Sequence, residues 1–235
     1  MKPYRKTAII VGVLFIIGTG AGILSVVFTG PILGDPDYLT KFSANENQII
    51  TGAAFVLIMG FALAMMSVML FPIFKKYNEA LALGAVVFRG VLEAVTYIVI
   101  VMSWLLLITI SREYVKAGAP DVSNFQTFGT LLQGVTYWSD HILAIVFTLG
   151  ALIIYYLFFQ SKLIPRWLSV WGLVGALLYL AAPLLNVFDP QHPSLSLSVG
   201  WGRLMWPLAV QEMVFAVWLI VKGFNPSAIV SESAK

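Results

Sequence analysis

The sequence predicts an all-α membrane protein in which residues 1–224 form one bundle of six transmembrane helices. Of its 235 residues, 60% are hydrophobic and only 11% are charged, whereas about a quarter of the residues in a soluble domain carry charge. The apolar residues gather into six runs, each long enough for the roughly 20 residues that a helix needs to cross a bilayer. We therefore expect the lipid bilayer to be the main partner of this chain.

Short polar or proline-containing stretches separate the six runs. The first run resembles the start of a signal peptide because Lys2, Arg5 and Lys6 precede it. At roughly 20 residues it is too long for an h-region of about 7–15, and no small-residue cleavage site follows, so we expect an uncleaved helix. Residues 225–235 are expected to form a flexible tail. The predicted spans are about 7–28, 47–71, 82–110, 129–159, 167–187 and 203–221.

The basic residues predict the orientation of the bundle. The N-terminus, the Lys75–Lys76 pair, Lys162 with Arg166, and Lys222 would all lie on one side of the membrane, while the other connections mix acids with bases. By the positive-inside rule this side is the cytoplasm. We expect both termini there, in a bacterial cytoplasmic (inner) membrane.

Composition also excludes several classes of function. The net charge is +3 and the pI about 9.1, but the bases lie at the ends of apolar runs, so they act as topology signals and no nucleic-acid partner is expected. Cysteine is absent, which removes disulfides and thiolate chemistry. The sequence also lacks the GxxxxGK(S/T) phosphate-binding loop, the HExxH motif of zinc proteases, the GxSxG motif of α/β-hydrolases and the GxGxxG motif of dinucleotide-binding folds.

The third run is unusual because it carries two charges, Arg89 and Glu93, one helical turn apart. Counted at 1.5 Å per residue, Glu93, Asp140 and Glu212 each lie roughly 14–17 Å inside their runs. Half of a bilayer core is about 15 Å. The three carboxylates thus fall near one plane, and ionisable groups at such depth are candidates for function.

One arginine does not balance three acids. If these groups meet and His141 is neutral, two negative charges remain, so the cluster should take up protons, charge His141 or bind a cation. We expect Arg89 to face the bundle and to compensate Glu93 and at least one acid from the fourth or sixth span. The candidates for a ligand or cation site are Arg89, Glu93, Tyr97, Asp140, His141, Gln211 and Glu212. For a metal they are His141, Asp140, Glu93 and Glu212.

Three classes of function follow from these candidates. The first is a cation- or proton-linked transporter or a protein that binds a small ligand near the midplane. The second is a metal-dependent intramembrane enzyme, because Asp, Glu and His can hold Zn, Mn or Fe together. The third is a non-catalytic accessory, sensory or immunity protein, in which the polar groups only hydrogen-bond helices together. The sequence determines neither the substrate, the cofactor nor the oligomeric state.

Three stretches resemble one known family. They are SKLIPRWLSVWGLVGALLYL at 161–180, RGVLEA at 89–94 and QEMVFAVWLIVKGF at 211–224. In their order and in the six-span layout they are similar to the bacterial integral membrane proteins of domain of unknown function 4386. The resemblance implies a bacterial cytoplasmic-membrane protein. It supplies no activity and no catalytic residue.

Overall fold

A computed structural model describes residues 4–117, 122–189, 195 and 200–228. Within these residues the chain is almost entirely helical, and six helices are long and apolar enough to cross a membrane. The predicted fold class is therefore confirmed. The elements are α1 (Arg5–Leu33), α2 (Tyr38–Ala44), α3 (Glu46–Phe74), α4 (Glu79–Ala85), η1 (Val86–Leu92), α5 (Glu93–Ala117), α6 (Val122–Ser161), α7 (Arg166–Asn186), η3 (Gly200–Met205) and α8 (Trp206–Val221).

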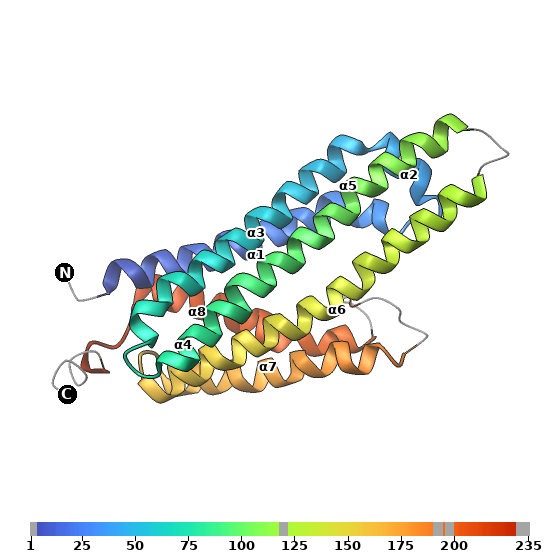
Figure 1. Cartoon of the computed structure of the whole chain (residues 1–235). Helices are drawn as coiled ribbons and strands as arrows, with labels where there is room; N and C mark the ends of the chain where they lie inside the picture. The colour runs from blue at the N-terminus through green and yellow to red at the C-terminus, as the bar shows by residue number, and fades with distance from the viewer. Residues whose placement is uncertain (1–3, 118–121, 190–194, 196–199, 229–235) are drawn as a thin grey trace.

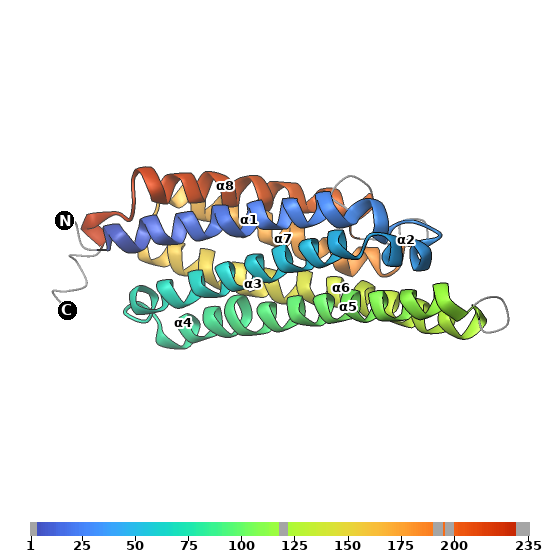
Figure 2. The ribbon, with the colours of Figure 1, turned by 90° about the horizontal axis from the view of Figure 1, so that it is seen from above.

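The six spans form a closed ring. The order of the helices around this ring could not be predicted from the sequence. Helix α1 packs against α3 and α8, α5 packs against α3 and α6, and α7 packs against α6 and α8. Figures 1 and 2 show the long helices running side by side along one elongated bundle. The side chains that face the axis come from all six spans, so polar groups far apart in the sequence can meet there.

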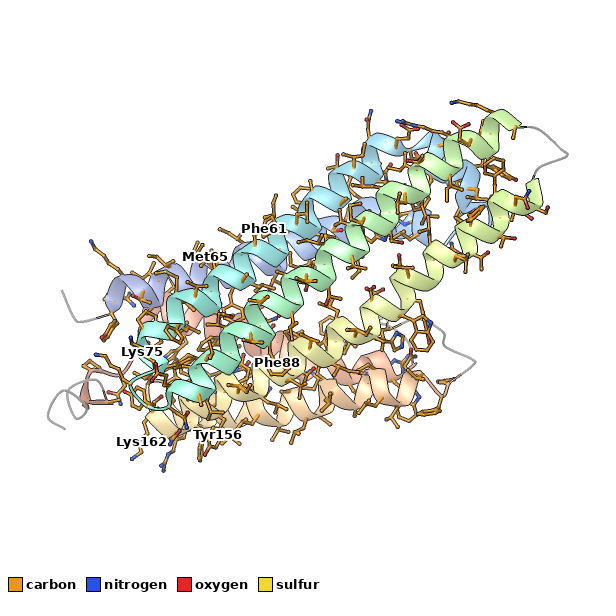
Figure 3. All side chains as sticks on the ribbon, in the orientation of Figure 1. Phe61, Met65, Lys75, Phe88, Tyr156 and Lys162 are labelled. Carbon is orange, nitrogen blue, oxygen red and sulfur yellow. The ribbon has the colours of Figure 1, made fainter. Side chains whose placement is uncertain are left out.

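Small residues bring the neighbouring helices of the ring together. A Cβ added to Gly22 would lie 2.7 Å from the Met59 sulfur of α3, and one added to Gly12 would lie 2.7 Å from the Ala216 carbonyl of α8. Large apolar side chains cover the outside instead. Phe61 and Met65 project away from the bundle (Figure 3) and are more than half exposed, as expected of residues that face lipid.

The two ends of the bundle differ in charge. The end that carries the start of α1 and the end of α8 also carries Lys75 and Lys162 (Figures 1 and 3), and we call it the basic end. There Arg5 donates hydrogen bonds to the Leu219 and Ile220 carbonyls of α8, at 3.0 and 2.6 Å. These carbonyls belong to the last helical turn, which lacks partners of its own. The opposite end, which carries α2, is called the distal end.

The helices extend beyond the predicted spans, most of all at the distal end. The third span continues to Ala117 and the fourth begins at Val122, where polar residues were expected to form a connection. These extensions are held by side-chain contacts that hydropathy does not report, such as the ion pair of Arg112 with Glu46. The predicted connection after the first run likewise contains the short helix α2.

Two prolines that lie beyond the predicted first and second spans are inside helices. Pro31 is within α1 and Pro72 within α3, each in the last helical turn or close to it. Each proline removes one intrahelical hydrogen bond and crowds the carbonyl four residues earlier, and each helix ends two residues beyond it. Of the predicted tail, residues 229–235 lie outside the described part. Its start contacts the bundle, because the Asn225 amide donates to the Leu163 carbonyl at 2.8 Å.

Candidate functional site

Arg89 and Glu93 lie where the third span changes its helical geometry. Residues Val86–Leu92 form a π-helix, and Glu93 begins the α-helix that follows. Arg89 Nη1 donates to both carboxylate oxygens of Glu93, at 2.6 and 2.7 Å. Both side chains are almost fully buried, with 2% and 1% exposed. Short π-helical segments are frequent at functional sites, and this one supplies the cation of the cluster.

Helix α8 contributes the second acid. Arg89 Nη2 donates to Glu212 Oε1 at 3.0 Å, and the Glu212 side chain retains 13% exposure. The expectation that Arg89 faces the bundle and compensates Glu93 and an acid of the fourth or sixth span is confirmed. The two terminal guanidinium nitrogens thus bind different acids. The hydrogen bond to Glu212 joins α8 to the third span across the ring.

Aromatic rings and a glycine shape the space around the guanidinium. Arg89 Cζ lies 4.1 Å from the ring centroid of Phe147 and 5.9 Å from that of Phe15, within the range of cation–π attraction. Helix α6 approaches closely because it has Gly150 at the contact. A Cβ there would lie 2.8 Å from the Arg89 backbone nitrogen and Cβ. The cluster is thus enclosed by α1, α6 and α8.

The charges of this cluster do not cancel. With all three groups ionised, Arg89 contributes +1 and the two glutamates −2, which leaves −1. Glu93 accepts hydrogen bonds from Arg89 with both of its oxygens, while Glu212 accepts one through Oε1. No other Lys or Arg of the described residues forms an ion pair with Glu93 or Glu212. A proton or a cation at Glu212 would restore neutrality, which a desolvated site strongly favours.

A cavity, which we call the distal cavity, lies between Tyr97 and the distal half of α1. Its volume is about 310 Å³, and its walls come from α1, α3, α5 and α6. Tyr97 lines it and also lies beside Glu93, one helical turn away. Trp104 lines it too, and its indole N–H is buried with no hydrogen-bond partner among the described residues. Native structures rarely leave such a donor unpaired, so this N–H is unusual among the residues that line the cavity.

Asp140 borders this cavity and stays apart from Arg89. The described residues contain no ion pair to Asp140, and it is exposed in the structure. The predicted common depth therefore holds for Glu93 and Glu212, which meet at Arg89, but not for Asp140. Asp140 lies on α6 across the cavity from α1, where it adds a second negative group nearer the distal end.

His141 is fully engaged by its neighbours. Its Nδ1 lies 2.8 Å from the Tyr137 carbonyl, and its Nε2 lies 2.9 Å from Asn186 Oδ1. No group of three or more His, Cys, Asp or Glu side chains within the described residues is arranged to hold a metal. The four metal candidates are therefore not brought together. Glu93 and Glu212 meet at Arg89, whereas His141 hydrogen-bonds to Asn186 of α7.

Gln211 lies beside the cluster and faces α7. Its Nε2 donates to the Leu168 carbonyl at 3.0 Å, while its buried Oε1 has no hydrogen-bond partner in the described part of the chain. The buried hydroxyls of Tyr155 and Ser169 are unpaired there as well. Tyr155 lies near Gln211 and Glu212.

The Arg89 cluster lies in a part of the chain that matches a known protein family. The model of a family described as Domain of unknown function (DUF4386) matches residues 10–223. The chain belongs to this family. The matched range contains the Arg89 cluster, the distal cavity and the six spans except for the first residues of α1, which begins at Arg5. No curated protein and no solved structure matches the chain.

The family description names no activity. Sequence reasoning found the three charges but missed the aromatic side chains around them, Phe15 and Phe147. Their positions on the inner faces of α1 and α6 are those of ordinary core residues. Only the order of helices in the ring shows that they contact Arg89. The one available signal was Gly150, a small residue on a helix that must approach a neighbour closely.

Proposed function

We propose that this member of the family is a multi-pass membrane protein that binds a proton or a small cation at the Arg89–Glu93–Glu212 cluster, and that it couples this binding to transport or to ligand recognition. The observation that carries the proposal is the unbalanced charge of a buried cluster with one arginine and two glutamates. Glu212 is the group that would take the cation.

The distal cavity supports a route to this cluster. Tyr97 lies between the cavity and Glu93, and Asp140 lines the cavity wall. A cation that enters from the distal end would meet Asp140 first and the phenol of Tyr97 next. Aromatic faces attract cations, and carboxylates do so more strongly. The series of groups therefore suits an incoming cation.

The orientation that goes with this proposal places the basic end in the cytoplasm. Lys75, Lys162 and Lys222 would then obey the positive-inside rule, and the cavity would open toward the outside of a cytoplasmic membrane. Reporter fusions after Lys76 and after Arg166 test this arrangement. An external location of either fusion would overturn it.

The binding experiment uses the whole chain purified in a neutral detergent. Melting temperatures are measured with sodium, potassium and tetramethylammonium chloride at constant ionic strength, because a ligand that binds only the folded state raises the melting temperature. We expect at least one cation to do so for the wild type, and Glu212→Gln to lose the effect. The control is Glu113→Gln, which removes an acid that is 55% exposed.

Protons need a separate measurement, because they cannot be varied at constant pH. The chain is reconstituted into vesicles that contain a pH-sensitive dye, and a pH gradient is imposed with and without each cation. We expect dye responses that depend on Glu212 and not on Glu113. If no cation shifts the melting temperature and proton flux equals that of empty vesicles, the proposal is wrong.

A further inference from the structure

A second cavity lies at the basic end, far from the Arg89 cluster. It has a volume of about 480 Å³ and lies between the α6–α7 turn and the segment after α8. The side chains that matter here are Lys162, Arg166, Trp218 and Lys222. Asn225 closes one side, since its amide and side chain donate to the Leu163 and Lys162 carbonyls at 2.8 and 3.4 Å.

The described residues that line this basic-end cavity carry charge of only one sign. Three cations border it, and among the described residues that line it there is no Asp or Glu. None of the ion pairs of the described residues involves Lys162 or Lys222. The cavity also borders the first turn of α7, which begins at Arg166 without a side-chain cap, and the free amides of such a turn favour anions. The cations and the helix terminus therefore both favour the binding of an anion.

Lys162 adopts a backbone conformation that costs energy. Its φ is +57°, a left-handed value that glycine adopts without strain and that is uncommon for other residues. Glycine is the usual residue directly after a helix, where Lys162 follows α6. A lysine at this position therefore brings an ammonium group to the cavity at the expense of local backbone strain.

Aromatic side chains indicate the depth of the cavity in a membrane. Trp218 lines the cavity, and its ring lies 6.3 Å from that of Trp167, nearly perpendicular to it. Trp167 is 53% exposed on the outer face of α7. Tryptophans on the lipid-facing surface near helix ends lie at the level of lipid headgroups. The three cations of the cavity are thus placed at the height of headgroup phosphates.

We propose that the basic-end cavity binds a phosphate-bearing anion, with the headgroup of an anionic phospholipid as the favoured source and free phosphate as the other. Basic pockets between helices on the cytoplasmic side are suited to such headgroups. Arg166 can offer two parallel N–H groups to a phosphate, and lysines act as point charges beside it. This proposal does not depend on the function proposed for the Arg89 cluster.

The test compares two double variants that each remove two cations from the basic end. The pocket variant carries Lys162→Gly and Lys222→Gln, and the control carries Lys75→Gln and Lys76→Gln, whose positions lie outside the cavity. Glycine at 162 relieves the backbone strain, so the pocket variant should fold. The full chain in neutral detergent is melted with phosphatidylglycerol, phosphatidylcholine or inorganic phosphate, and lipid retention is read by native mass spectrometry.

We expect phosphatidylglycerol, and not phosphatidylcholine, to raise the melting temperature of the wild type and of the control. The pocket variant should bind it about ten- to thirtyfold more weakly, as the loss of two headgroup-level cations predicts. If inorganic phosphate gives the same pattern, the source is the free anion. An equal loss in both variants, an equal response to both lipids, or no response in the wild type overturns the proposal. If the pocket variant melts early without lipid, Arg166→Gln replaces it in the mass measurement.

Discussion

Replacing Arg89 with alanine should leave two buried carboxylates without their cation. The guanidinium makes three contacts of 2.6–3.0 Å to Glu93 and Glu212, and the three side chains are between 1% and 13% exposed. Removal of one partner from a buried ion pair costs about 3–5 kcal/mol, because an uncompensated charge remains. We expect Arg89→Ala to lower the free energy of unfolding by about this amount.

The double variant Arg89→Ala with Glu93→Ala should be milder than the single variant, because it removes one of the two stranded acids. The matched control is Arg112→Ala. Arg112 is 53% exposed and pairs with Glu46 near the distal end, so its loss should cost only about 0.2–1 kcal/mol. Unfolding is followed by circular dichroism during titration with SDS in mixed micelles. If Arg89→Ala unfolds like the control, or if the double variant is less stable than the single one, the reasoning is refuted.

Two further substitutions test the packing around the site. Gly150→Ala should destabilise the bundle by about 1–3 kcal/mol, because its Cβ would meet rigid backbone atoms of Arg89; Gly134→Ala, with nothing within 4 Å, should be neutral or slightly stabilising, and equal effects would contradict the close approach. Asn186→Ala should cost about 1–3 kcal/mol, because it leaves His141 Nε2 buried without this partner. Asn47→Ala on the exposed side of α3 is its control, and both pairs are compared by thermal melting in detergent.

Much of the architecture could be predicted because run length and charge are local properties of the sequence. The six spans and the inward direction of Arg89 follow from the cost of placing polar groups in lipid. Helix ends were less predictable, because polar residues such as those of α2 keep helical geometry outside the apolar region. The π-helix around Arg89 was not predictable, since none of its residues is peculiar to that geometry.

The site itself was only half predictable, and the helix order explains why. Depth along each helix is only approximately legible from residue counts, which placed Asp140 too close to the level of Glu93 and Glu212. Direction around the ring is not legible. Glu212 of α8 reaches Arg89. Helix α6 also meets Arg89, but at Phe147 and Gly150, so Asp140, ten residues before Gly150, lies nearer the distal end and lines the distal cavity. His141 illustrates the same limit, since its partner Asn186 comes from α7.

A buried ionic cluster is weak evidence that its role is to stabilise the fold. Replacing such groups with apolar residues of similar volume is often neutral or stabilising by about 1–4 kcal/mol, because no charge then has to be desolvated. Here Phe15 and Phe147 already provide apolar walls around Arg89, so the triple variant Arg89→Met, Glu93→Leu, Glu212→Met should fold and melt at or above the wild-type temperature. If the cluster only holds helices together, that variant should also keep every cation response of the wild type. If the cluster binds a cation, as we propose, the variant should be stable but should show no cation response in the melting and vesicle assays. A triple variant that fails to fold would instead mean that the three charges are needed to assemble the ring, and would count against a primarily cation-binding role.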